Sequence, residues 1–480
     1  MYVAYYGIVH LAYWEYLGLF FYLVLVYLYF ARQKNMRIKK RPEYRWFIPG
    51  LFAKLIGAVF FSFIYFYYYE GGDTTGYFFS SVALSKLAFV DPMAFLKVWL
   101  GENTLMAREV FTEETGKPYT YVYLDDRQYM VVRLVTPFTI LCLNSFLITT
   151  VVVASVSYIG IWRLYLTFYR YFPRIHRELA VAVLLMPSAV MWGSSILKDT
   201  ITFSSFCWFI HALDNFWFRR VDRLASLVTM AIALTLIILI KPYIFMVMLP
   251  MCAVWISYAR VSRIQNAAIK YLALPVMLVG LSFGVLALLT ALGDQLGQFS
   301  LQLALDNILA TQKDLLQNEE YGTNRFDVGE MEATWGSVLS KFPIATTATL
   351  FRPFITECNN FVMVLAGLEN LFVLSVFVRM LIKTRIVFLG SAITGNPLIL
   401  TCVIFSLLYG FVTGITTPNF GALVRFKIPL MPTFMGAMYM IMFLVDERNR
   451  LRGRGLPFRF QNYRNGDPYV RRTRDGLPIL

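Results

Sequence analysis

Long apolar blocks recur along the whole chain and limit the folds that it can adopt. Most hold about 17 to 25 residues, the length that a helix needs to cross the hydrocarbon core of a bilayer. Of the 480 residues, 58% are hydrophobic and only 15% are charged, whereas soluble domains carry roughly a quarter charged residues. We therefore predict an all-α, polytopic integral membrane protein with about 11 transmembrane helices. The predicted crossings are residues 11–31, 48–69, 146–168, 179–192, 201–218, 224–240, 243–258, 272–292, 361–381, 397–415 and 428–445.

Basic residues give the orientation of these helices. Seven Lys and Arg fall between Arg32 and Arg45, directly after the first apolar block. Because short cytoplasmic loops are enriched in such residues, this loop is predicted to lie inside the cell. The N-terminus is then outside and the C-terminus is cytoplasmic. The predicted domains are a transmembrane domain (1–445), which has long outer loops at 71–133 and 293–360, and a basic, flexible cytoplasmic tail (446–480).

The first predicted outer loop contains further helical signals. Residues 77–89 and 92–99 mix aromatic and aliphatic residues with Ser and Lys, which is typical of helices that lie in the membrane interface. Residues 118–129 are polar and rich in tyrosine, and they are predicted to form a loop.

Charge and cysteine usage exclude several classes of function. The net charge of +15 resides mainly in loops between apolar blocks, so we expect a lipid bilayer as partner and no nucleic acid. The five cysteines show no CxxC spacing and the three histidines lie far apart. We therefore predict no zinc or other metal cluster. A requirement for a cofactor, including a divalent metal ion, stays undecided.

The sequence Gly71-Gly72-Asp73 follows the second apolar block. Two glycines permit a tight turn where the chain leaves the bilayer. Asp73 is then a carboxylate at the membrane face, where it can accept a proton from a hydroxyl nucleophile. We predict Asp73 as the catalytic base. A solvated helix end is the alternative interpretation.

Cations on the same predicted face are candidate ligands for a substrate phosphate. Lys198 follows a short, proline-containing block, Arg352 precedes the block at 361–381, and Arg425 and Lys427 lie in a short outer turn. Arginine binds phosphate oxygens through two nitrogens at once. Local ion pairing, or contact with ordinary lipid headgroups, would explain the same residues without catalysis.

Three acidic residues are predicted to support this site. Asp199 follows Lys198, and Glu357 lies five residues after Arg352. Glu369 falls in the middle of an apolar block, and a charge at that depth should face the interior of the helix bundle. Glu369 is interpreted mainly as a structural hydrogen-bond partner.

The chain resembles the polytopic GT-C glycosyltransferases and related membrane proteins of bacterial surface-polysaccharide loci. That superfamily carries an acidic residue in its first long outer loop, followed by interfacial helices. This chain departs from the pattern because its first predicted outer loop has no Asp-x-Asp or Glu-x-Asp pair. The resemblance rests on four strings, which are Gly71-Gly72-Asp73, Pro187-Ser188 through Ser195 to Lys198-Asp199, Arg352-Pro353-Phe354, and Leu423-Val424-Arg425-Phe426-Lys427-Ile428-Pro429.

The resemblance implies a glycosyltransferase of the bacterial inner membrane. Its partners would be a polyprenyl-phosphate-linked saccharide as donor and a glycan acceptor. Three alternatives stay open. They are a Wzy-like polymerase of lipid-linked repeat units, a transporter or flippase for a glycolipid, and a structural membrane subunit without chemistry.

Overall fold

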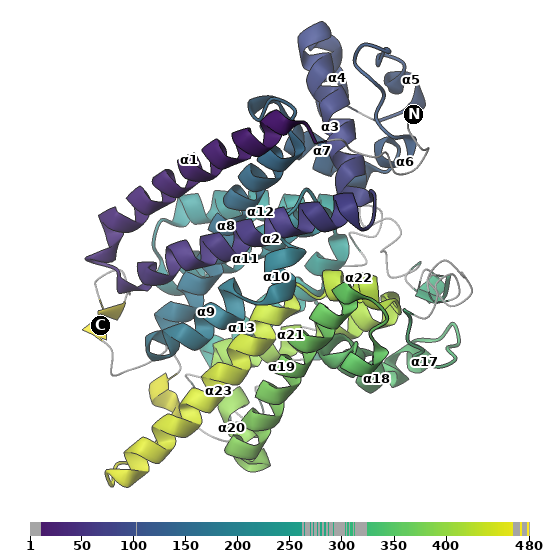
Figure 1. Cartoon of the computed structure of the whole chain (residues 1–480). Helices are drawn as coiled ribbons and strands as arrows, with labels where there is room; N and C mark the ends of the chain where they lie inside the picture. The colour runs from purple at the N-terminus through teal and green to yellow at the C-terminus, as the bar shows by residue number, and fades with distance from the viewer. Residues whose placement is uncertain are drawn as a thin grey trace. The chain divides into compact units, whose positions relative to one another are not determined.

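In the computed structural model of this chain, the described residues are 11–101, 103–261 and 324–463. Isolated positions between 264 and 312, and the pairs 471–472 and 478–479, are also described. This part of the chain is predominantly helical (Figure 1). Strands β1 (Arg471–Arg472) and β2 (Pro478–Ile479) form a short antiparallel pair.

Eight helices among the described residues are long and apolar enough to cross a membrane. They mark the chain as a multi-pass membrane protein, and they coincide with eight of the predicted crossings. Their bounds are Tyr13–Ile38 (α1), Pro42–Tyr67 (η1, Pro42–Trp46, followed by α2, Phe47–Tyr67), Phe146–Tyr171 (α8), Arg223–Ile240 (α12), Pro242–Val261 (α13), Phe361–Thr384 (α19), Pro397–Thr416 (α21) and Leu430–Gly453 (α23).

The other three predicted crossings have different outcomes. The block at 179–192 forms two short helices, α9 (His176–Leu184) and α10 (Pro187–Met191). Nine residues of helix extend only about 14 Å, roughly half of the hydrocarbon core. The block at 201–218 forms α11 (Lys198–Leu213), which continues as a π-helical turn, η3 (Asp214–Arg219). The block at 272–292 lies largely outside the described residues, as does the first half of the predicted loop 293–360.

The chain divides into two compact units. Unit 1 is Met1–Leu164, Ala189–Ala212 and Leu224–Lys241, and unit 2 is Tyr165–Ser188, Leu213–Arg223 and Pro242–Leu480. Besides its membrane helices, unit 1 contains α3 (Asp73–Val90), α4 (Pro92–Leu100), α5 (Leu105–Arg108), α6 (Thr120–Tyr123) and α7 (Asp126–Leu141). Helices α17 (Trp335–Ser340), α18 (Phe342–Phe351), η6 (Ile355–Glu357), α20 (Ile386–Gly395), α22 (Phe420–Phe426) and η7 (Phe460–Tyr463) belong to unit 2.

The predicted outer loop 71–133 is mostly helical and partly buried. Both predicted interfacial helices are present as α3 and α4, but α3 begins four residues earlier than expected. Helix α3 packs along α7 (Figure 1). A Cβ at Gly76 of α3 would meet the Tyr121 hydroxyl oxygen at 2.3 Å, so this glycine permits α3 to lie close against α6. The expectation of a loop over 118–129 is wrong, because α6 and the start of α7 fall within it.

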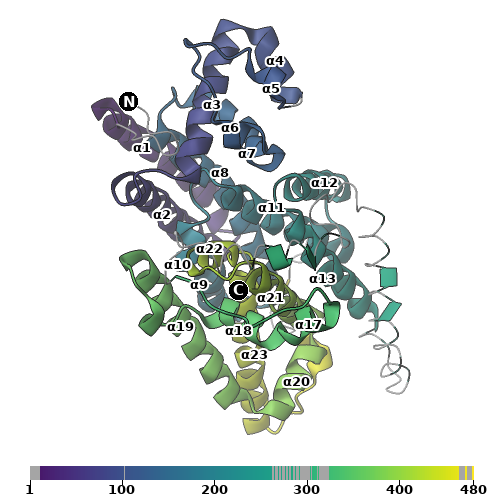
Figure 2. The same cartoon turned by 90° about the vertical axis from the view of Figure 1, so that its right-hand side faces the viewer.

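The described half of the predicted loop 293–360 contains a buried apolar helix. Helix α18 packs along α21, where a Cβ at Gly414 would meet the Ala345 carbonyl oxygen at 2.2 Å. The Thr349 hydroxyl donates to the Gly410 carbonyl at 2.7 Å. Small residues permit such close packing of helices in membranes. Figure 2 shows α17 and α18 in front of α21.

The tail expected to be flexible from residue 446 begins as a helix. Helix α23 continues to Gly453, and buried Glu447 on it accepts a hydrogen bond from Arg174 at 2.7 Å. The Asn396 side chain donates to the carbonyl of buried Tyr463 at 2.7 Å. These contacts anchor the described tail as far as Tyr463. The prediction of a flexible tail, made from its polar composition, is therefore wrong for residues 446–463.

Candidate functional site

Asp73 is the first residue of α3 and follows a glycine turn. Gly71 and Gly72 have φ values of 140° and 143°, which residues with a Cβ rarely adopt. The Gly72 amide donates to Thr75 Oγ1 at 3.0 Å, and the Thr75 hydroxyl donates back to the Gly72 carbonyl at 2.8 Å. Asp73 is half-buried and lies at the positive end of the helix dipole. The predicted tight turn is confirmed.

The turn at 192–197 connects α10 with α11 and carries the second part of the site. Thr74 Oγ1 and Ser195 Oγ lie 2.9 Å apart, so this turn lies against the first turn of α3. From the other side, buried Lys54 of α2 donates to the Gly193 carbonyl. The Lys54 ammonium thus holds this turn inside unit 1.

Lys198 begins α11 and pairs with a carboxylate that the sequence did not single out. Its Nζ lies 3.7 Å from Asp125 Oδ2, the separation of an ion pair rather than of a hydrogen bond. Asp125 caps α7, accepting from the amides of Arg127 (2.9 Å) and Gln128 (3.3 Å). Partial burial opposes ionisation of Asp125, but Lys198 and these hydrogen bonds outweigh it and hold its pKa below the ordinary value.

Asp199 and Lys241 form a second ion pair at the same helix terminus. Lys241 Nζ lies 2.5 Å from Asp199 Oδ1, and both side chains are buried. The pair joins the start of α11 to the residue that follows α12. In the structure Lys241 neutralises Asp199.

Unit 2 contains a separate, buried polar cluster. Ser188 donates to Glu369 through both its amide and its hydroxyl, each at 2.6 Å. Lys427 donates to the Asn370 side-chain oxygen, and the Asn370 amide donates to the Pro353 carbonyl at 3.0 Å. The interpretation of Glu369 as an inward-facing hydrogen-bond partner is confirmed.

Lys427 was predicted to bind a substrate phosphate from a short outer turn, but only 1% of its surface is exposed. Burial lowers its pKa to about 8, although the Glu369 carboxylate favours the charged form. A phosphate could reach Lys427 only after this cluster opens.

Arg352 is held by a carboxylate and two aromatic rings. Its Nε donates to both oxygens of Glu357, at 3.0 and 3.1 Å. The guanidinium carbon lies 5.3 Å from the ring centroid of Phe326 and 5.1 Å from that of Phe420. Burial alone would raise the pKa of Glu357, but the hydrogen bond from Arg352 brings it below the ordinary value. Arg425 is half-buried and lies 5.8 Å from the ring centroid of Phe426.

The predicted site residues therefore fall in two units. Asp73, Lys198 and Asp199 belong to unit 1, where the contact between Thr74 and Ser195 connects the segments that carry them. In unit 2, Arg352 donates a hydrogen bond to Glu357, and the Glu369 carboxylate favours the charged form of Lys427. The five predicted residues in this unit are Arg352, Glu357, Glu369, Arg425 and Lys427.

Sequence reasoning missed Asp125, Ser195 and the role of Lys54. The sequence signal for Asp125 was an aspartate just before a helix-forming run, the pattern of an N-cap. Within the described parts of the chain, no three His, Cys, Asp or Glu side chains form a group that could hold a metal ion.

Comparison with known proteins finds no matching family model, no similar curated protein and no similar solved structure. The chemistry of the site must therefore be inferred from its own residues.

Proposed function

We propose that this protein is a membrane-embedded glycosyltransferase that takes a sugar from a polyprenyl-phosphate-linked donor. It would act in the assembly of a cell-surface polysaccharide, in the inner membrane of a bacterium. The multi-pass helical fold supports the bilayer as its environment. A lipid-linked donor is the form in which a sugar stays available to an enzyme at the membrane face.

The contact between Thr74 and Ser195 is the observation that carries this proposal. It brings the turn that presents Asp73 against the turn that leads to Lys198. A carboxylate and a cation in one unit are the two groups that this transfer needs. A base must take the acceptor's proton, and a positive charge must stabilise the phosphate as it leaves.

The proposed reaction proceeds as one displacement at the anomeric carbon of the donor sugar. The acceptor hydroxyl loses its proton to Asp73 as its oxygen forms the new glycosidic bond. The bond between the anomeric carbon and the phosphate oxygen breaks, and the electron pair stays on the polyprenyl phosphate. Lys198 stabilises that negative charge. Asp125 keeps the Lys198 side chain in place before the substrate binds, at 3.7 Å.

Three cations of unit 2 remain proposed phosphate ligands, but they differ in how readily a phosphate could reach them. They are Arg352, Arg425 and Lys427. Arg352 must release Glu357, and Lys427 must leave a buried cluster. Arg425 is half-buried, whereas Lys427 is buried.

Replacement of Asp73 by Asn tests the proposal. The substitution keeps the shape of the side chain but removes the base, so glycan transfer in membranes of a complemented deletion strain should fall by 10²-fold or more, the order of a general base. Asp91→Asn is the matched control, because Asp91 is also an acidic residue at a helix start, is exposed, and caps α4 through contacts that Asn can reproduce. Undiminished transfer by an Asp73→Asn protein that accumulates normally would contradict the proposal.

The buried cluster of Glu369, Asn370 and Lys427 in unit 2 favours a glycolipid transporter as the second candidate. Ionisable side chains inside a membrane domain often line a substrate pathway. The glycolipid that accumulates in a deletion strain separates the possibilities. A truncated glycan indicates the transferase, single complete repeats indicate the Wzy-like polymerase, and completed glycolipid on the inner leaflet indicates the transporter.

A further inference from the structure

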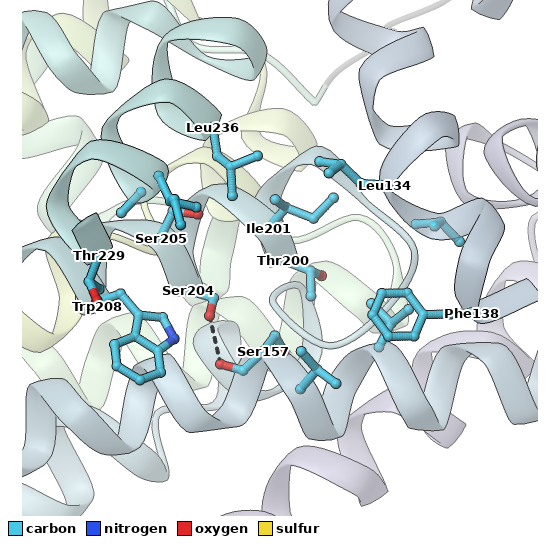
Figure 3. Close-up of a pocket in the computed structure, with 15 residues that line it drawn as sticks. Leu134, Phe138, Ser157, Thr200, Ile201, Ser204, Ser205, Trp208, Thr229 and Leu236 are labelled. Atoms are coloured by element: carbon cyan, nitrogen blue, oxygen red, sulfur yellow. Dashed lines mark hydrogen bonds between the residues drawn. The ribbon is translucent and has the colours of Figure 1, made fainter. Parts of the chain in front are cut away.

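Two pockets of unit 1 differ in the side chains that line them. Among the described residues, no charged side chain lines the groove drawn in Figure 3. The other pocket, which has a volume of about 540 Å³, is lined by two cations, Arg108 and Lys117, and by two tyrosines, Tyr119 and Tyr121. We call it the basic pocket. The proposed reaction uses none of these four side chains.

The basic pocket has an excess of positive charge. The described residues that line it include Arg108 and Lys117 but no aspartate or glutamate. Lys117 is exposed and Arg108 is half-buried, so both can reach a ligand from solvent. A concave site with a positive charge attracts anions and repels cations. The pocket therefore favours an anionic ligand.

Hydrogen bonds hold the Arg108 guanidinium in the wall of the pocket. Its Nε and Nη2 donate to the Pro118 carbonyl at 3.3 and 2.9 Å. Nη1, on the other side of the planar group, takes no part in these bonds. The Thr112 amide donates to Thr115 Oγ1 at 2.9 Å and closes a turn in the segment between Arg108 and Pro118. Because the guanidinium is already oriented, it loses little conformational entropy when it binds an anion.

The two tyrosines are held against α3, the helix that begins with Asp73. The Tyr119 amide donates to Ser80 Oγ at 3.2 Å. The Tyr121 hydroxyl lies against Gly76, about one helical turn after Asp73. Both rings are half-buried, and their centroids lie 5.9 Å apart. The pocket is therefore fixed in position relative to the proposed base, within the same unit.

An acidic sugar carries both kinds of group that this pocket can bind. The faces of tyrosine rings bear a negative partial charge, which attracts the polarised C–H groups of a pyranose ring. Arginine and lysine are donors only, and their strongest hydrogen bonds go to carboxylates and phosphates. The volume of about 540 Å³ lies within the range of about 300–1,000 Å³ that small-molecule pockets occupy. A neutral sugar would leave the cations unused, and an inorganic anion would leave the rings unused.

We infer that the basic pocket binds a carboxylate-bearing sugar residue, so that the glycan on which this protein acts is acidic. The preference for an anion rests on the pocket alone. That the anion belongs to a glycan rests on the proposed function. No bond forms or breaks in the pocket, so Arg108, Lys117 and the two tyrosines determine specificity and are not catalytic residues.

Calorimetric titration of the full chain in phosphatidylcholine nanodiscs tests this inference with two matched probes. The first is a tetrasaccharide of galacturonic acid, and the second is the same tetrasaccharide with its carboxyl groups reduced to alcohols. The acidic probe should bind roughly tenfold more tightly or better, the factor that one hydrogen bond to a charged group supplies. Its binding should weaken as NaCl is added, because salt screens exposed charges.

Matched variants test the two kinds of side chain. Lys117→Gln removes an exposed charge from the pocket and should weaken binding of the acidic probe roughly tenfold. Lys86→Gln removes a charge that is also exposed, from α3 and outside the pocket, and should bind as the wild type does. Tyr119→Leu should weaken binding roughly fivefold, whereas Tyr119→Phe keeps the ring and should not.

Equal binding of the two probes, or wild-type binding by Lys117→Gln, would overturn the inference. Equal competition by inorganic phosphate or by a tetraglutamate peptide would also overturn it, because the pocket would then be a general anion site or a peptide site.

The Asp73→Asn variant separates this result from the proposed function. It should bind the acidic probe as the wild type does while it transfers no sugar. Normal binding together with normal transfer by Asp73→Asn would support the pocket and contradict the proposed base. Loss of transfer in Asp73→Asn, with no preference of the wild type for the acidic probe, would support the base and overturn the pocket.

Discussion

The hydroxyl oxygens of Thr74 and Ser195 are 121 positions apart in sequence but lie 2.9 Å apart in the buried interior of unit 1. Each belongs to a segment that presents a charged residue, Asp73 in one and Lys198 in the other. A buried hydrogen bond between hydroxyls fixes both segments more tightly than a contact between exposed charges would. This pair is therefore the structural basis for treating Asp73 and Lys198 as parts of one site.

The pairing of Asp125 with Lys198 predicts a dependence of stability on pH. The pKa of Asp125 is lowered in the folded chain, so between its folded and its unfolded value the unfolded state binds more protons, and stability rises with pH. The contribution of Asp125 is complete above the unfolded value and is lost as pH falls through the folded value. The Tm difference between wild type and Asp125→Asn in detergent should be largest near pH 7 and should shrink towards pH 3. A difference that does not vary with pH would contradict the pairing.

We predict that Lys54 supports transfer activity but lowers the stability of the folded protein. Methionine at this position removes the cost of burying a lysine, so the Tm of Lys54→Met should equal or exceed that of the wild type. The Gly193 carbonyl then loses its donor, and the turn that leads to Lys198 is no longer held. Transfer should fall at least tenfold. Lys39→Met, at an exposed position after α1, is the control and should alter neither quantity. A large fall in Tm without a change in transfer would indicate a purely structural lysine.

The charges of Glu369 and Lys427 should be coupled in unit 2. Both side chains are buried, and the charge of each stabilises the charge of the other, so the loss of one leaves the remaining charge less well compensated. The single variants Glu369→Gln and Lys427→Met should therefore lower the Tm strongly, and the double variant should lower it by less than the sum of the two. Thermal unfolding in detergent measures all three. Strictly additive shifts would show that the two side chains act independently.

Two glycine-to-alanine substitutions should change stability in opposite directions. A Cβ at Gly57 of α2 would meet the carbonyl oxygen of Val190 in α10 at 2.3 Å, so Gly57→Ala must force α2 away from Val190. We expect a loss of about 1–3 kcal/mol, the usual cost of overpacking. Gly390 of α20 has open space around its Cβ position, so Gly390→Ala should be neutral or stabilising by up to about 1 kcal/mol. Similar Tm values for the two variants would contradict the close contact at Gly57.

The sequence by itself determined the features that depend on local patterns. Apolar block length identified the eight candidate membrane helices, because crossing a bilayer requires a nearly fixed number of residues. The glycines at 71 and 72 identified a tight turn, because few other residues adopt positive φ. The depth of Glu369 in an apolar block indicated its inward orientation, because a charge facing lipid is too costly.

Only the tertiary structure decided which side chains meet. The turn with Ser195 contacts Thr74, Lys54 holds Gly193, and Asp125 pairs with Lys198, and none of these pairs is close in sequence. The position of Lys427 in an outer turn indicated a phosphate ligand, but its side chain is buried and donates to Asn370. Periodicity and charge distribution report how one segment meets lipid or water. They carry no information on its distant partners, because the packing of the whole chain selects those contacts.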